Sequence, residues 1–200
     1  MAVTETDPSA RSPRAEKTRA TIADALLSLL EEGDLQPTAT RIAERAGISL
    51  RLIYHHFGDL EELFREVTQR EGYRIAGEVE LVPADLPFAE RLDRVVEQRS
   101  RVLEIVTPVC RAAVLHEPFS EVLRASRDAG YAMAEYEVTQ VFAAELGPLP
   151  ADERRARLDA LALTSGWPAW NALRVSGRSV DQARAALHRS MELVLLSPHR

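Results

Sequence analysis

The segment from residue 38 to residue 57, TATRIAERAGISLRLIYHHF, constrains the fold of this chain more than any other. It contains two stretches with helical spacing of apolar residues, joined through a single glycine, Gly47. Glycine readily adopts the positive φ that ends one helix and directs the next across it. Thr38 and Ser49 precede the two stretches, and both are residue types that cap helix N-termini. The segment therefore predicts two helices of about two turns each, joined by a turn at Gly47.

Apolar and small side chains in this segment are spaced to form a core between the two helices. Ile42, Ile48 and Ile53 would supply that core. Ala43 would face the second helix, where a larger side chain would push the helices apart. Such a pair can place its second helix in the DNA major groove. An ordinary helical hairpin inside a bundle has the same features, so geometry alone leaves both interpretations open.

The rest of the chain also shows helical periodicity, with Gly and Pro between the periodic stretches. We expect Pro108 to separate two helices and Pro168 to bend another, because proline lacks a backbone N–H and crowds the preceding turn. The predicted fold class is all-α, with about nine helices. They are expected at residues 13–33, 38–46, 49–57, 59–76, 87–106, 108–116, 119–146, 151–176 and 179–196.

The periodicity divides the chain into a tail, two domains and a connecting helix. Residues 1–12 are small, polar and interrupted by proline, which predicts a disordered tail. Residues 13–57 are expected to form an N-terminal three-helix domain of the helix-turn-helix type. The helix at 59–76 connects it to residues 77–200, which are expected to form a C-terminal helical bundle.

Composition and charge narrow the class of protein further. Cys110 is the only cysteine, which excludes an internal disulfide and a cysteine-rich zinc site. The chain has no secretory signal and no run of about 20 apolar residues, so we expect a cytoplasmic protein without a membrane span. The net charge is −6, but residues 10–57 carry seven Lys or Arg against six Asp or Glu. A weakly cationic segment of this kind is compatible with DNA phosphates, whose contacts act at short range.

Residues 38–64 resemble the DNA-binding signature of TetR-type regulators. The shared pattern combines a threonine, small residues around a glycine, a Tyr-x-His-Phe sequence and an acidic cap. Here its positions are Thr38, Ile42-Ala43, Ala46-Gly47-Ile48-Ser49, Tyr54-His55-His56-Phe57, Asp59 and Leu63. The resemblance implies an all-helical regulator that binds double-stranded DNA through the second helix of the pair.

The same resemblance implies a set of DNA contacts. Base edges would be contacted around Leu50 and Arg51, and arginine can bind guanine through two hydrogen bonds. Arg41 would add a further contact, whereas His56 and Phe57 would pack the second helix against its neighbours. The residues implied in contact with phosphate or sugar are Thr38, Ser49, Tyr54 and His55.

Two positions depart from the family pattern. Arg51-Leu52 stand where many relatives have Gly-Thr, and Leu60 stands where a lysine usually contacts a phosphate. Because each neutralised phosphate adds to salt-dependent affinity, the loss of that lysine should weaken non-specific binding. Basic residues at the start of the first helix could contact DNA or simply be solvated. These residues are Arg11, Arg14, Lys17 and Arg19.

Residues 151–196 are predicted to form a homodimer interface. Residues 158–173 are apolar on two faces, so both faces need a packing partner. A single subunit could bury these faces itself, which is the alternative. Pairing of two subunits would place two reading helices about 34–36 Å apart on a palindromic site. The apolar residues of the last helix are Val180, Ala183, Leu187, Met191, Val194 and Leu195.

A small-molecule effector site is predicted within the C-terminal domain. Apolar walls with a few polar groups are typical of such cavities, although each aromatic singly is more often a core residue. The bend expected at Pro168 lies beside two tryptophans. The candidate lining residues are Cys110, His116, Tyr131, Trp167, Trp170 and Asn171.

No catalytic motif, phosphate-binding loop or metal-ligand spacing occurs in the sequence, so we expect no enzyme, no cofactor and no metal site. The favoured hypothesis is a homodimeric regulator, acting as a repressor, whose DNA affinity falls when an effector binds. The alternative is a helical dimerisation or scaffold protein that has lost DNA binding. The leucine at position 60 is the one feature that supports this alternative.

Overall fold

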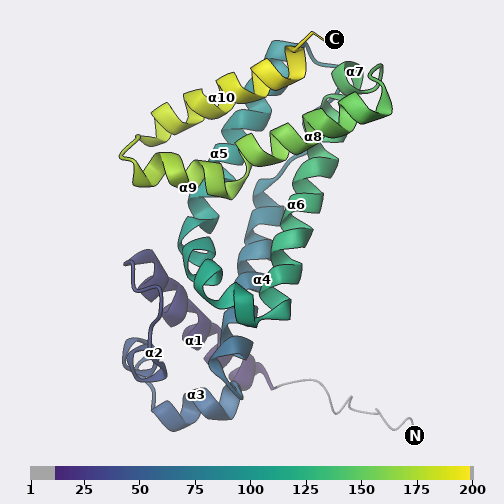
Figure 1. Cartoon of the computed structure of the whole chain (residues 1–200). Coiled ribbons are helices and arrows are strands. Elements are labelled where there is room, and N and C mark those ends of the chain that lie inside the picture. The colour runs from purple at the N-terminus through teal and green to yellow at the C-terminus, as the bar shows by residue number, and fades with distance from the viewer. Residues whose placement is uncertain (1–11, 199–200) are drawn as a thin grey trace, which may run out of the picture. The chain divides into compact units, whose positions relative to one another are not determined.

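Residues 12–198 are described by a computed structural model in which helices are joined by short turns (Figure 1). The expected tail, residues 1–12, lies outside the described residues except for Ser12. Within 12–198 there is no strand, which confirms the all-α prediction. The helices are α1 (Pro13–Glu31), α2 (Ala39–Ala46), α3 (Leu50–His56), α4 (Leu60–Glu78), α5 (Phe88–His116), the short 3-10 helix η1 (Glu117–Phe119), α6 (Glu121–Val141), α7 (Ala143–Leu146), α8 (Ala151–Ser165), α9 (Trp167–Val175) and α10 (Val180–Leu196).

The chain forms two compact units. The N-terminal unit extends to Arg70 and the C-terminal unit begins at Glu71. The boundary lies inside α4, so this helix contributes its first half to one unit and its second half to the other.

Local side-chain chemistry sets the ends of the helices in the N-terminal unit. Gly33 and Gly47 follow α1 and α2 with φ of 91° and 67°, values that favour glycine. The hydroxyls of Thr38 and Ser49 accept hydrogen bonds from the first turns of α2 and α3. The Asp59 carboxylate caps α4 by accepting from the backbone N–H of Glu62 at 2.8 Å. The turn at Gly47 and the caps at Thr38, Ser49 and Asp59 are as predicted.

The N-terminal unit has a small core where α1 meets α2 and α3. The apolar residues that recur at helical spacing along α1 form a buried stripe, and Ala43 is buried as expected. Ile48 is only half-buried, so it lies at the edge of the core rather than inside it. The innermost side chains are Ile22, Leu26, Leu29, Leu30, Ile42, Ile53, Phe57 and Leu63.

The core of the C-terminal unit lies between α5, α8 and α10, with α6, α7 and α9 completing it. Helix α10 packs against both α5 and α8. Trp170 of α9 and Phe142 after α6 are the largest side chains buried there. The other core residues of these helices include Leu92, Val95, Val96, Leu103, Val138, Val141, Leu146, Leu161, Ala183, Leu187, Met191 and Leu195.

Two predictions about proline are wrong. Pro108 does not separate two helices, because α5 runs through it from Phe88 to His116. Buried side chains continue along the same face before and after Pro108, so packing maintains the helix across the missing N–H. Pro168 does not bend a long helix. Helix α8 ends before Gly166, and Pro168 occupies the first turn of α9. A backbone N–H at this position would have no partner within the helix, so its absence in proline costs nothing.

Two further expectations need correction. The single helix expected at 119–146 is divided into η1, α6 and α7. The apolar stripe of α10 does not face a partner, since Ala183, Leu187, Met191 and Leu195 are buried in the core of their own subunit. The alternative of internal burial therefore holds for this stripe.

Candidate nucleic-acid interface

The hydroxyls of Thr38 and Ser49 lie at the starts of α2 and α3, on the surface of the N-terminal unit. Thr38 Oγ1 accepts from the backbone N–H of Arg41 at 3.3 Å, and Ser49 Oγ accepts from that of Leu52 at 3.3 Å. In both cases the capping bond uses an oxygen lone pair and leaves the O–H proton free to donate. Each cap can therefore hold its helix and donate to a phosphate at the same time.

One edge of α3 is exposed along its whole length. Leu50, Arg51, Tyr54 and His55 all lie on it, and Tyr54 is 52% exposed. Ile53, on the opposite side, is 1% exposed. The helical repeat brings the four exposed residues together, because positions four apart share a face. All seven predicted DNA-contact residues are thus exposed, as contact with DNA requires, and the contacts themselves stay predictions.

The arginines of α2 and α3 differ in how freely they can reach a phosphate. The Arg41 guanidinium lies 3.0 Å from the carboxylate of Asp34. Arg45 binds Glu32 through two hydrogen bonds, which raise the pKa of Arg45. Arg51 forms no ion pair with any residue of 12–198. It is therefore the cation of the two helices that needs no exchange of partner to bind DNA.

Arg19 does not lie where a DNA contact would need it. Its side chain is buried between α1, α3 and α4, so the prediction that it could reach DNA is wrong. It donates to the main-chain carbonyl of His56 and to the carboxylates of Glu62 and Glu66. The sequence carried a signal for this role, because Arg19 falls on the apolar stripe of α1, three residues before Ile22. Arg14 and Lys17 are exposed, and Arg11 lies outside the described residues.

The end of α3 is packed as predicted. Phe57 is fully buried and the His56 side chain is half-buried. Burial lowers the pKa of His56, and the neighbouring charges of His55 and Arg19 lower it further. His56 is therefore neutral near neutral pH and adds no charge to the exposed edge of α3.

This N-terminal geometry has a counterpart among known proteins. Residues 22–67 match the family model described as bacterial regulatory proteins, tetR family. The chain carries a tetR-family N-terminal domain. The match contains α2, α3 and the turn at Gly47, which are the elements that expose the candidate DNA contacts. No curated protein matches the chain.

Solved structures share the fold of the whole chain. A tetR-family transcriptional regulator from Streptomyces coelicolor has a TM-score of 0.71 at 21% identity, covering 90% of this chain and 79% of its own. A transcriptional regulator from Rhodococcus sp. Rha1 has a TM-score of 0.66 at 20% identity, covering 90% of this chain and 95% of its own. A TetR-like transcriptional regulator from the same Rhodococcus has a TM-score of 0.62 at 22% identity, covering 94% of this chain and 100% of its own. At these identities the likeness establishes the TetR-like fold.

Three of the predicted effector-site residues lie on α9 and are hydrogen-bonded to α5. Trp167 Nε1 donates to Thr107 Oγ1 at 3.2 Å, and Trp170 Nε1 donates to the carboxylate of Glu104 at 2.7 Å. A third bond, at 2.9 Å, runs from Arg111 Nε to the Asn171 side-chain oxygen. Both indole N–H groups thus donate hydrogen bonds to side chains of α5 within the C-terminal unit. Cys110, on the same stretch of α5, is half-buried, and burial raises its pKa to about 11.

The other two candidates lie elsewhere in the C-terminal unit. Tyr131 of α6 lines a cavity of about 30 Å³ between α6 and α8, together with Leu161, Ser165 and Gly166. A space of this size holds about one water molecule. His116 is half-buried at the C-terminal end of α5. Of the six predicted residues only Tyr131 lines this cavity, and a shared effector site stays a prediction.

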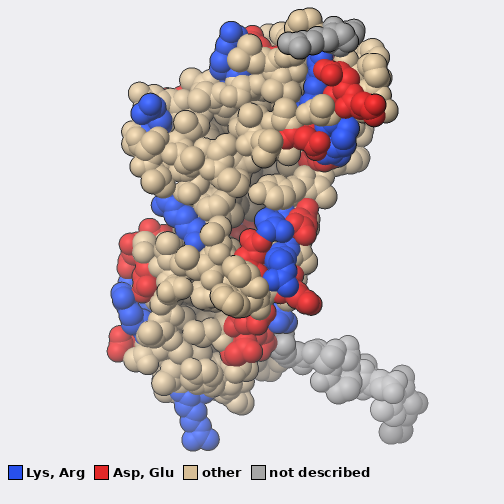
Figure 2. Space-filling view, viewed as in Figure 1, with Lys and Arg blue, Asp and Glu red and all other residues tan. Residues whose placement is uncertain are grey.

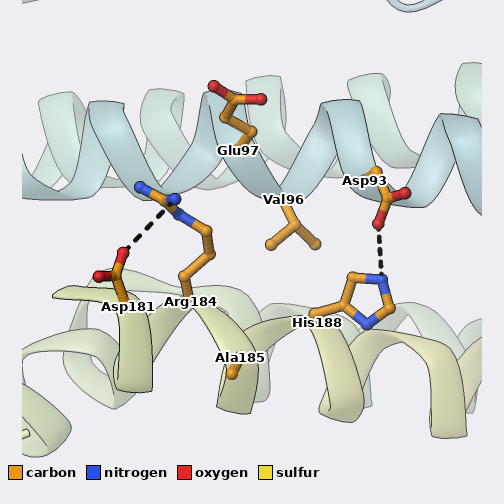
Figure 3. A pocket seen from close by; sticks show the side chains of 7 residues that line it. All are labelled: Asp93, Val96, Glu97, Asp181, Arg184, Ala185 and His188. Carbon is orange, nitrogen blue, oxygen red and sulfur yellow. Dashed lines mark hydrogen bonds and ion pairs between the residues drawn. The ribbon is translucent and has the colours of Figure 1, made fainter. Parts of the chain in front are cut away.

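A larger hollow, of about 420 Å³, lies between α5 and α10 (Figure 3). Its side chains pair with one another: His188 faces Asp93 at 3.0 Å, and Arg184 lies 3.7 Å from Asp181. None of the predicted effector residues lines it. The described residues contain no cluster of three potential metal ligands, and none of their helices is long and apolar enough to cross a membrane.

Proposed function

We propose that this protein is a homodimeric DNA-binding transcriptional regulator that represses its target and is released from DNA by a small molecule. The observation that carries the proposal is the exposed edge of α3. There Arg51, Tyr54 and His55 are exposed, and the capping hydroxyl of Ser49 is exposed at the start of the same helix. Arginine supplies base readout, and the neutral donors fix the register on phosphates.

Dimerisation through α8 and α10 is supported by the exposed surface of the C-terminal unit. Figure 2 shows few charged side chains over α9 and the adjoining part of α10, whereas charged side chains gather over the start of α8. Leu163 on α8 is 77% exposed, and Leu193 and Leu196 on α10 are 52% and 55% exposed. Exposed leucines on neighbouring helices are a feature of surfaces that bind a partner. A two-fold dimer made this way would read a palindromic operator.

The effector part of the proposal is supported by the resemblance and by the loose packing of α6. Residues 125–133 of α6 are exposed without interruption, and the small cavity beside Tyr131 lies next to them. A ligand that enlarges this cavity would act only if it prefers one arrangement of the subunit over another. We propose an uncharged or weakly polar small molecule as the effector class, because the charged lining residues Arg99 and Glu135 are already ion-paired and the rest of the lining is apolar or weakly polar.

An electrophoretic shift with DNA from next to the protein's own gene tests the function. The wild-type protein should shift the fragment, and Tyr54→Ala should abolish the shift without changing the dimer content measured by sedimentation. Tyr136→Ala is the matched control, because Tyr136 is 59% exposed but lies on α6 in the other unit. An intact shift with Tyr54→Ala would refute the proposal that the exposed edge of α3 contacts DNA. A wild-type protein that shifts no DNA would support the scaffold alternative instead.

A further inference from the structure

One buried arginine in the N-terminal unit links α1 to the end of α3 and to α4. Arg19 on α1 is 4% exposed. Its guanidinium donates to the main-chain carbonyl of His56, the last residue of α3, and lies 3.9 Å from the ring centroid of Phe57. The same group is paired with Glu62 at 3.2 Å and Glu66 at 3.0 Å, both on α4.

The space occupied by the Arg19 side chain could be filled without a charge. A buried ion pair is often no more stabilising than apolar side chains of similar volume, because both charges lose their hydration. What arginine adds is direction: its planar group presents five N–H donors in a fixed geometry. Arg19 therefore fixes the distance and angle between the end of α3 and the first turns of α4, which an apolar residue cannot do.

We propose that Arg19 is a positioning residue for operator recognition, which orients α3 without touching DNA. This inference rests on the proposed DNA-binding function. The contacted carbonyl belongs to His56, directly after Tyr54 and His55 in the same helix. A change at this carbonyl therefore moves the exposed edge of α3 as a whole.

The role predicts a loss of specificity rather than a uniform loss of affinity. Contacts to base edges need the side chain at a defined place in the groove, whereas much of non-specific binding comes from charge alone. A displaced α3 should therefore weaken binding to the operator more than binding to random DNA. Simple unfolding of the domain would weaken both equally.

Arg19→Lys is the informative substitution, and Arg45→Lys is its control. Lysine keeps the charge, but its three donors share one nitrogen and cannot bind a carbonyl and two carboxylates in the arginine geometry. Arg45 likewise holds several partners, Glu32 and Ser28, but these link α2 to α1 and leave α3 untouched. Glu66→Gln is the second variant, which removes one carboxylate from Arg19 and keeps the side-chain shape.

The experiment begins with selection of the preferred duplex by the wild-type dimer from a random-sequence pool. Affinities for that duplex and for a scrambled one are then measured by fluorescence anisotropy, with helix content and melting temperature recorded for each variant. For Arg19→Lys we expect the operator-to-scrambled affinity ratio to fall by about 10-fold or more, comparable to a mismatched base pair. Affinity for the scrambled duplex should change by less than about 2-fold, since the charge is kept.

The remaining outcomes separate the two proposals. The ratio should be unchanged for Arg45→Lys and should fall less for Glu66→Gln than for Arg19→Lys. If Arg19→Lys does not fold, an unchanged ratio for Glu66→Gln overturns the inference. It is also overturned if Arg19→Lys keeps the wild-type ratio or loses both affinities equally. A wild-type protein that enriches no sequence refutes the regulator proposal, and this inference with it.

Discussion

Replacing Arg51 should cost more DNA affinity than replacing Arg41, although both are exposed arginines, on α3 and α2 respectively. The difference lies in their partners before DNA arrives. Arg41 already lies 3.0 Å from Asp34, and its side chain is 57% exposed. Arg51 forms no ion pair within the described part of the chain and sits in the first turn of α3.

The expected magnitudes follow from that difference. A bidentate arginine–guanine contact contributes about 1–3 kcal/mol. In a dimer on two half-sites, Arg51→Ala should therefore cost about 2–6 kcal/mol, or roughly 30-fold to more than 10⁴-fold in affinity. Arg41 exchanges one exposed ion pair for another when it binds a phosphate, so Arg41→Ala should cost at most about 1 kcal/mol per half-site.

Salt titrations by fluorescence anisotropy distinguish the two roles. Arg51→Ala should relax the preference at one base position and leave the slope of log affinity against log salt unchanged. Arg41→Ala should weaken all sequences alike and reduce that slope by about 0.9 for each phosphate that the variant no longer neutralises. Equal reductions in affinity for the two variants, or a larger reduction for Arg41→Ala, would refute the ranking.

Two further predictions concern the two units separately. Burial raises the pKa of Glu66, but hydrogen bonds from Arg19 and Arg70 outweigh it and leave the pKa below its usual value. Because the folded pKa is the lower one, this stabilisation is complete above the unfolded pKa and disappears as the pH falls through the folded pKa. Urea unfolding should therefore show Glu66→Gln less stable than wild type at about pH 7, with the difference shrinking as the pH falls below the usual range of a carboxyl pKa, whereas a constant difference would contradict this pairing. Burial raises the pKa of Cys110 to about 11, so the native protein should react slowly with a thiol reagent at about pH 8 and rapidly once unfolded; fast reaction of the native protein would contradict the burial.

The sequence predicted the N-terminal unit well because short-range chemistry controls it. A glycine in the left-handed region at Gly47 and capping hydroxyls at Thr38 and Ser49 act within a few residues of the chain. Local effects of this kind do not depend on packing with distant segments, so they can be read from the residues alone. The exposed edge of α3 follows directly from them.

The C-terminal unit was harder to predict because its helix ends depend on packing. Pro108 would end an isolated helix, yet α5 continues through it with buried residues on either side. Trp170 is apolar by its pattern, but its N–H bonds Glu104, a partner 66 residues away. Periodicity marks which residues face inward and does not say whether they face their own subunit or another one.

Arg19 is the case in which a departure from a pattern carries the most information. Its basic side chain suggested either a DNA contact or a solvated helix end, whereas its spacing on the apolar stripe of α1 places it inside the domain, where it is 4% exposed. The two arginines of α2, Arg41 and Arg45, are paired with the carboxylates of Asp34 and Glu32. With those charges neutralised and Leu60 in place of a lysine, net charge contributes little at this surface. On the proposed function, recognition therefore depends on neutral donors and on Arg51 held at defined positions, and in our proposal the buried Arg19 contact holds α3 in place.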